Sequence, residues 1–217
     1  MKFYHEMIQK LRDGTPFRFA RFGDGEWGCM YGVTGQNRDG NTYLPELART
    51  LKCILTLEPK YYMGLQYGVL YNEQLRDYVF RKLFYLYKIS WVNGDILHQA
   101  SEFGYLKWFT NALKERNVHI IGAEYFNVLP YHHIVIPETN SFTHNKDIFK
   151  EIEAIDVTGY NTDPVYLVAA AMNSNVIIDK LPDNVTAIDI GSVFDPYLGR
   201  PRASYQHKMN VTLKDLF

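Results

Sequence analysis

The chain has 217 residues, of which 47% are hydrophobic and 22% are charged, the balance of an ordinary soluble globular protein. This composition excludes a disordered tail, a collagen-like fibre and a small domain held together by disulfides. Its 24 acidic and 23 basic residues leave a formal net charge of −1, so no overall field draws the chain to nucleic acid or to anionic lipid.

The chain carries no segment typical of secretion or membrane insertion. Its first residues lack the apolar stretch of a signal peptide, and no run reaches the ~18 apolar residues that span a bilayer. Cys29 and Cys53 show no metal-binding spacing, and two reduced thiols are typical of a cytosolic protein. Because no repeat or linker interrupts the sequence, we expect residues 1–217 to form a single cytoplasmic domain.

Apolar periodicity predicts strands that alternate with helices. A first helix has Phe3, Met7 and Leu11 at four-residue spacing and ends at Gly14. A long helical stretch, interrupted at Gly104, runs to about residue 116, and further helices are predicted at residues 44–55, 75–86 and 176–181. Strands are predicted at residues 17–22, 61–66, 89–92, 118–122, 134–136, 165–170 and 186–190. This alternation indicates an α/β architecture with a mostly parallel, buried sheet.

Small and polar residues follow most of the predicted strands. They occur at residues 23–26, 66, 93–95, 124, 137–140, 173–175 and 191–195. In an open α/β sheet, ligands bind beyond the carboxyl ends of the strands. These segments therefore predict a binding site at one edge of the sheet.

Residues 23–28, GDGEWG, follow the first predicted strand and fit the G-x-G-x-x-G pattern of a dinucleotide-binding turn. However, the carboxylates of Asp24 and Glu26 would repel a pyrophosphate, and no acidic residue ends a second strand about 20 residues further on. A divalent cation reverses this repulsion, because carboxylates bind Mg²⁺ or Mn²⁺, which then neutralises an approaching diphosphate. The alternative is structural: Asp24 caps the following helix and Glu26 lies in its first turn. Chemistry alone leaves both interpretations open.

Residues 19–26, FARFGDGE, resemble the signature of the GT-D type glycosyltransferases, a family first described as a domain of unknown function. Residues 187–192, AIDIGS, resemble that family's last strand and turn, although Ser192 stands where the family often has histidine. Similarity is weaker at residues 136–142 and near Val168. The resemblance implies a Rossmann-like single domain with helices on both faces of the sheet. It also implies that the protein uses UDP-glucose or a similar nucleotide sugar and needs Mn²⁺ or Mg²⁺.

The resemblance assigns roles to the residues of the first motif. Asp24 and Glu26 become the metal and nucleotide-sugar motif, and Arg21 becomes a partner for the diphosphate. Gly23 and Gly25 would form the turn around the nucleotide sugar, because glycine allows close approach of the backbone.

Further candidates for binding the nucleotide sugar lie at other strand ends and in the C-terminal segment. Tyr67 is placed to stack on a uracil or a sugar ring. Residues 196–214 contain no acid, and arginines there could close over the diphosphate through paired hydrogen bonds or form an ordinary solvated tail. The complete set of these candidates is Tyr67, Asn93, Asp189, Ser192, Arg200 and Arg202.

Four residues are candidates for acid–base catalysis. Asp95, His98 and Glu102 are spaced three and four residues apart at the start of a predicted helix, so they can share one helix face. A base with a pKa near neutrality suits deprotonation of an acceptor hydroxyl; the alternative is a capping Asp95 beside a solvated face. Asp195 follows the last strand, which Asp189 ends, and each can complete a metal shell, act as a base or form a turn.

The sequence thus favours a metal-dependent glycosyltransferase that transfers a hexose from a UDP-sugar to a hydroxyl acceptor. The acceptor is a glycan on a protein or a lipid, as the resemblance implies, or a hydroxylated base in phage-type DNA. Two alternatives stay open. An NAD(P)-dependent oxidoreductase would use the same glycine turn, and a non-catalytic sugar- or nucleotide-binding module would use the aromatic residues.

Overall fold

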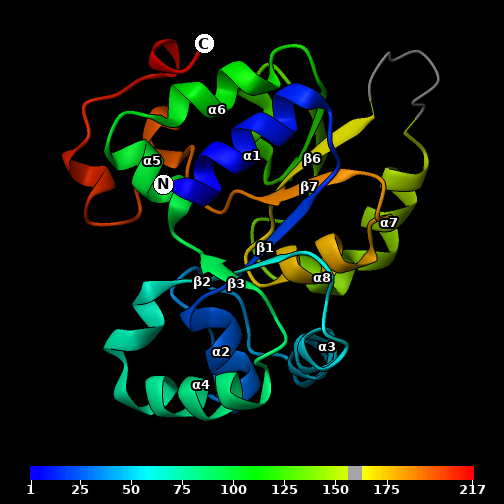
Figure 1. Ribbon diagram of the computed structural model, residues 1–217, viewed down its shortest axis with the longest axis vertical. Helices are drawn as coiled ribbons and strands as arrows, with labels where there is room; N and C mark the ends of the chain where they lie inside the picture. The colour runs from blue at the N-terminus through cyan, green and yellow to red at the C-terminus, as the bar shows by residue number, and fades with distance from the viewer. Residues whose placement is uncertain (156–162) are drawn as a thin grey trace.

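The structure, a computed structural model, describes residues 1–155 and 163–217. Its centre is one seven-stranded sheet in the order β3-β2-β1-β7-β6-β4-β5 (Figure 1), and neighbouring strands pair in parallel. The strands are β1 (Arg18–Phe22), β2 (Tyr62–Leu65), β3 (Trp91–Asn93), β4 (Asn117–Gly122), β5 (His132–Val135), β6 (Pro164–Ala169) and β7 (Thr186–Asp189). The predicted α/β fold with a Rossmann-like, parallel sheet is confirmed.

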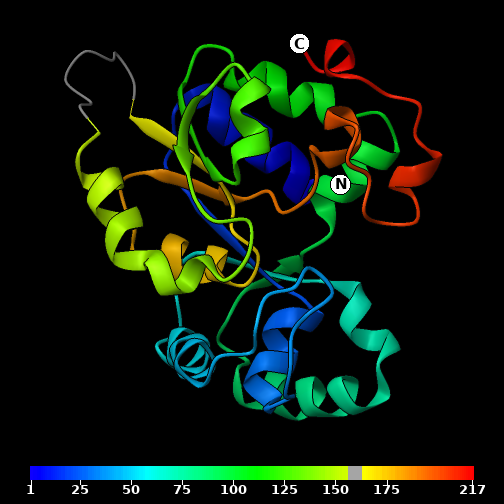
Figure 2. The same cartoon turned by 180° about the vertical axis from the view of Figure 1, so that it is seen from behind.

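In the described residues, α-helices cover both faces of this sheet (Figures 1 and 2). One face packs against α1 (Lys2–Asp13), α5 (Ile96–Glu102) and α6 (Leu106–Leu113). The other packs against α2 (Asp24–Tyr31), α3 (Pro45–Thr56), α4 (Glu73–Tyr85), α7 (Asn145–Glu153) and α8 (Asn173–Lys180). None of the described helices has the length and apolar character needed to cross a bilayer.

Local sequence explains most of these elements. Helix α1 buries Tyr4, Met7 and Leu11, and Gly14 ends it in the left-handed conformation with φ 69°. Gly104 also adopts positive φ, 76°, and divides the predicted long helical stretch into α5 and α6. The periodicity does not predict α7, because Ile148 is its only fully buried residue.

The order of the strands creates a switch point at the centre of the sheet. The chain builds outward from β1 through β2 to β3 on one side, whereas β4 to β7 form the other side. Strands β1 and β7 are neighbours, with Phe19 opposite Ile188. Connections leave such a point in opposite directions and open a crevice at the carboxyl ends of the strands.

Candidate functional site

A cavity of about 200 Å³ lies at the carboxyl ends of the strands, on both sides of this switch point. Residues from β1, β6 and β7 line it, together with Gln66 and Ala123, which directly follow β2 and β4, and Glu138, which lies shortly after β5. The cavity therefore lies where the strand-end argument places a binding site. The predicted site residues that line it are Arg21, Asp24, Gly25, Glu26, His98, Asp189, Ser192 and Arg202.

A buried ion pair joins the two central strands at the base of the cavity. The Nη2 atom of Arg21, on β1, donates to Oδ1 of Asp189, at the end of β7, over 3.0 Å. The two residues are only 7% and 3% exposed. Burial raises the pKa of the Asp189 carboxyl, and the guanidinium and the Gly191 N–H oppose that rise. Removing either partner would leave a buried charge without compensation, which costs about 3–5 kcal/mol.

His98 extends this pair toward Ser192. Its Nδ1 lies 3.2 Å from Nη1 of Arg21, and its Nε2 lies 3.2 Å from the Ser192 hydroxyl. Because a guanidinium only donates, Nδ1 must accept, and the ring proton resides on Nε2. Burial and the charge of Arg21 lower the pKa of His98 to about 3. In this arrangement the ring is neutral, both of its nitrogens are engaged, and it orients the Ser192 hydroxyl. A role of His98 as a general base stays a prediction.

The Gly-Asp-Gly-Glu turn begins α2 directly. Gly23, and not Asp24, is the N-cap residue, and its N–H donates to Oε2 of Glu26 over 2.8 Å. A side chain at position 23 would displace Gln66, because its Cβ would lie 2.0 Å from Oε1 of that residue. Glu26 is buried, and burial raises its pKa to about 7, whereas Asp24 is exposed. The helix-turn interpretation thus holds for Glu26, yet both carboxylates also line the cavity.

The carboxylates of Asp24 and Glu26 suit a divalent cation that takes its other ligands from water and from the substrate. The described residues contain no cluster of three or more His, Cys, Asp or Glu side chains able to hold a metal, so no closed cage of protein ligands exists there. Mg²⁺ is commonly held by one or two carboxylates, with water and substrate phosphates completing its shell. Asp24 and Glu26 match that donor set on one wall of the cavity.

Two buried nitrogen atoms of the cavity wall lack a hydrogen-bond acceptor among residues 1–155 and 163–217: Nε of Arg21 and Nδ2 of Asn41. Buried donors in native proteins are almost always satisfied. Both atoms can only donate, so a ligand that satisfies them carries acceptor oxygens. This pattern suits an anion such as a diphosphate.

Several predicted residues lie outside the cavity lining. Asp95 accepts from Nε2 of Gln66 over 3.0 Å and from the Tyr67 N–H over 2.8 Å, so it ties down the segment after β2. Asn93 accepts from the Asp95 N–H over 2.9 Å and thereby shapes the turn before α5. Glu102, the last residue of α5, is exposed. Of Asp95, His98 and Glu102, only His98 lines the cavity.

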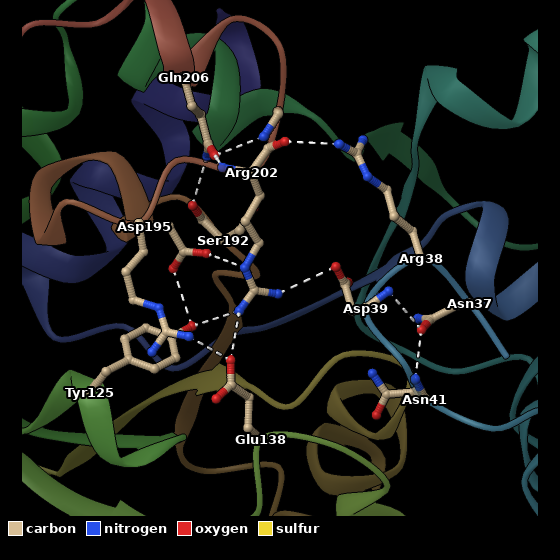
Figure 3. A network of polar contacts seen from close by, with 12 residues as sticks. Asn37, Arg38, Asp39, Asn41, Tyr125, Glu138, Ser192, Asp195, Arg202 and Gln206 are labelled. Atoms are coloured by element: carbon tan, nitrogen blue, oxygen red, sulfur yellow. Dashed lines mark hydrogen bonds and ion pairs between the residues drawn. The ribbon is translucent and has the colours of Figure 1, made fainter.

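Arg202 lies at the centre of a polar network over the cavity (Figure 3). Its Nε lies 2.7 Å from Oδ2 of Asp195, and its Nη2 donates to the Tyr125 hydroxyl over 3.0 Å. Two further carboxylate oxygens lie 3.4 Å away in Asp39 and 3.8 Å away in Glu138. Asp195, fully buried behind Arg202, serves as an anchor for the arginine, and burial raises its pKa to about 6.

The segment that carries Arg202, residues 199–208, is called here the C-terminal strap. Gln206 ties the strap to the turn after β7. Its Oε1 accepts from the Arg202 N–H over 2.7 Å, and its Nε2 donates to the Ser192 carbonyl over 2.8 Å. Arg38 donates to the Arg202 carbonyl over 3.0 Å. Arg200, which also belongs to the strap, forms an ion pair with Glu138 over 2.8 Å. Of the two alternatives for this segment, a solvated tail does not describe Arg202, which is held by these contacts and lines the cavity.

Sequence reasoning missed the partners that tertiary structure supplies: Asn37, Asp39, Asn41, Gln66, Tyr125, Glu138 and Gln206. Gln66 and Glu138 lie in segments already identified at strand ends, so their position was visible but their role was not. Asp39 lies in a polar loop and Gln206 in the strap, where no periodic pattern signals a contact.

The chain matches no family model and no curated protein sequence. It is similar to solved structures of the domain of unknown function 1792. One, a selenomethionine-substituted form, has a TM-score of 0.63 and 19% identity, covering 95% of this chain and 88% of that one. Another, described as having a distinct glycosyltransferase fold, has a TM-score of 0.62 with the same identity and coverage. At this identity the likeness shows the fold, and at that level it confirms the resemblance drawn from residues 19–26 and 187–192.

Proposed function

We propose that the protein is a metal-dependent glycosyltransferase that transfers a hexose from a nucleotide sugar, UDP-glucose or a similar UDP-sugar, to an acceptor hydroxyl. The acceptor would belong to a glycan on a protein or a lipid, or to a hydroxylated base in DNA. One observation carries the proposal. Asp24, Glu26 and the buried guanidinium of Arg21 line a single cavity at the switch point of the sheet, in a fold shared with a structure described as a glycosyltransferase fold.

The residues of the cavity suit the charge of such a donor. The buried donors on Arg21 and Asn41 would hydrogen bond to oxygens of the diphosphate. The Ser192 hydroxyl, accepting from His98, is free to donate its own proton to the ligand. Arg202, from the strap, would close the site on the remaining side.

Asp24 and Glu26 would hold Mn²⁺ or Mg²⁺. When bound, the cation supplies neutralisation of the charge that develops on the departing diphosphate. Glu26 is already oriented by the N–H of Gly23. Burial raises the pKa of Glu26 to about 7, and the Gly23 N–H and the charge of Arg21 oppose that rise.

Removing these carboxylates tests the proposal. Asp24→Ala and Glu26→Ala should each lower Mn²⁺-dependent UDP-sugar turnover by at least about 100-fold, and calorimetry should show weaker UDP binding in Mn²⁺. Glu115→Ala, which removes an exposed carboxylate outside the cavity, is the matched control for the exposed Asp24 and should behave as wild type. The proposal fails if turnover and UDP affinity are unchanged in both variants.

The residue that follows β2 argues against the oxidoreductase alternative. A dinucleotide fold needs an acidic residue there to bind the ribose hydroxyls, and this chain has Gln66. Tight binding of NAD(H) without metal in a calorimetric titration would reverse this preference. Binding of nucleotide sugars without transfer or hydrolysis would instead favour a non-catalytic module.

A further inference from the structure

We infer that the acceptor enters through a groove beside β5, that it is uncharged and rich in hydroxyls, and that Glu138 takes the proton from its reacting hydroxyl. This inference rests on the proposed function and assigns the acceptor side of the same site.

The groove adjoins the central cavity. It has a volume of about 690 Å³ and lies between the residues that follow β4 and those that end and follow β5. Ala123, Tyr125 and Glu138 line both spaces. An acceptor in the groove would therefore meet a donor in the cavity at these three residues.

Of the three shared residues, only Glu138 is suited to accept a proton. Ala123 has no polar side chain, and the Tyr125 hydroxyl already donates to Asp195 and accepts from Arg202. In the described part of the chain, both ion pairs of Glu138 use Oε1, with Arg200 at 2.8 Å and Arg202 at 3.8 Å. These contacts hold the carboxylate in place and leave Oε2 to face a ligand. Figure 3 shows Glu138 below Arg202 with its second oxygen outside the network.

The charges of the groove indicate the class of acceptor. Glu124 and Glu138 contribute two carboxylates, and Arg200, the one cation among the lining residues, is paired with Glu138. A polyanion such as DNA gains affinity by neutralising its phosphates with lysine and arginine, so this wall disfavours it. Carboxylates and the amide of Asn127 instead accept hydrogen bonds from hydroxyls, and Val135 and Pro137 offer apolar surface to the C–H face of a sugar ring.

The transfer step follows from this placement. The acceptor oxygen forms a bond to the anomeric carbon of the donor, and its proton passes to Oε2 of Glu138. The bond between the anomeric carbon and the diphosphate oxygen breaks, and its electron pair leaves with UDP. Because a base of this kind serves a single displacement, the anomeric configuration of the transferred sugar is inverted.

The test measures transfer from UDP-glucose with Mn²⁺ to uncharged aryl glycosides, and in a parallel arm to a duplex that contains 5-hydroxymethylcytosine. Glu138→Gln should lose at least about 100-fold in kcat, with UDP affinity within about threefold of wild type. Formate should restore transfer in Glu138→Ala, because a small carboxylate can replace a missing base but not a missing structural contact. Product analysis should show inversion. Glu58→Gln is the matched control, since that carboxylate is 49% exposed against 51% for Glu138 and also pairs with a cation, Lys88 at 3.2 Å.

The outcomes separate the two levels of inference. Wild-type protein that in Mn²⁺ neither binds nor turns over UDP-glucose or any similar UDP-sugar overturns the proposed function and this inference with it. If wild type transfers, then unimpaired Glu138→Gln, retention at the anomeric carbon, or transfer to the DNA duplex alone overturns the acceptor assignment and leaves the proposed function standing.

Discussion

At the scale of single residues, one buried guanidinium organises the polar groups at the base of the cavity. Arg21 donates to Asp189 through one terminal nitrogen and to His98 through the other, and His98 in turn donates to Ser192. These hydrogen bonds fix the tautomer of His98, because Nδ1 must accept and Nε2 must carry the proton. The cost of burying Arg21 and Asp189 is offset because they compensate each other.

The pKa of His98 predicts an acid-sensitive stability. The ring titrates at about 3 in the native protein and at about 6.5 in the unfolded chain. Below pH 6.5 the unfolded chain therefore binds a proton that the native protein does not, and stability falls as pH drops toward 3. Between pH 7 and pH 5 this group should cost at most about 2 kcal/mol.

Urea unfolding at the two pH values measures this cost. His98→Gln, whose amide can still accept from Arg21 and donate to Ser192, should flatten the pH dependence. His144→Gln, at an exposed site, should leave it unchanged. Equal pH dependence in wild type and His98→Gln would contradict the assignment.

At the scale of elements, the turn after β7 is shaped around Arg21. Gly191 has φ 48°, and a Cβ at this position would lie 1.9 Å from Nη2 of the arginine. The glycine therefore meets two demands at once, a left-handed backbone and close packing against a charged side chain. Its N–H also donates to Asp189 over 3.0 Å.

Gly191→Ala should displace Arg21 and weaken UDP binding. Gly104 is the matched control: it has φ 76°, but a Cβ added there would meet no atom within 4 Å. Gly104→Ala should thus show only the cost of left-handed backbone, about 1–3 kcal/mol, whereas Gly191→Ala should lose more stability and also UDP affinity. Calorimetric titration and thermal unfolding of both variants check this difference, and equal losses would be evidence against the packing argument.

The order of strands and helices made part of the site predictable from the sequence. Asp24 and Asp189 were found because each lies at the end of a strand, and parallel strands bring their carboxyl ends to one edge. That both line one cavity with Arg21 needed no tertiary information beyond that rule. Glu102 was expected at the site, but it does not line the cavity. Residue spacing predicts which side chains share a helix face, but it does not predict how far each turn of that helix lies from the carboxyl ends of the strands.

The rest of the site depends on contacts that no local pattern encodes. Asp39 reaches Arg202 from a loop without periodicity, and Gln206 reaches Ser192 from a segment of irregular backbone. Neither has a neighbour in the sequence that signals its partner. Such contacts are set by how the chain returns to the site, which only the folded structure shows.

At the scale of the whole molecule, the strap connects distant parts of the chain across the cavity. Arg202 contacts Asp39 in the loop that follows α2 and Glu138 in the segment that follows β5. Beyond the strap, the chain runs beside α6 (Figures 1 and 2), where Thr110 donates to the Leu216 carbonyl over 2.8 Å. The site is thus completed by the last part of the chain.

Gln206→Ala should loosen the strap without unfolding the protein. The variant leaves the N–H groups of Arg202 and Ala203 and the Ser192 carbonyl without their partner, a loss of about 1–3 kcal/mol. Hydrogen exchange of residues 200–208 should become faster, and KM for the UDP-sugar should rise. Gln9→Ala, which removes an exposed glutamine on α1, is the control. Unchanged exchange across the strap would show that Gln206 does not secure it.

The pairing of β1 with β7 has a kinetic consequence. It sets Arg18 opposite Ala187, so the two halves of the described sheet join through strands that are far apart in the sequence. During synthesis, β1, β2 and β3 leave the ribosome well before β7, and one edge of β1 has no partner strand until β7 is made. An apolar strand with an unpaired edge is prone to associate with other chains, and such non-local closure is slow. Nascent chains that end before residue 186 should therefore be the form of this protein most dependent on chaperones.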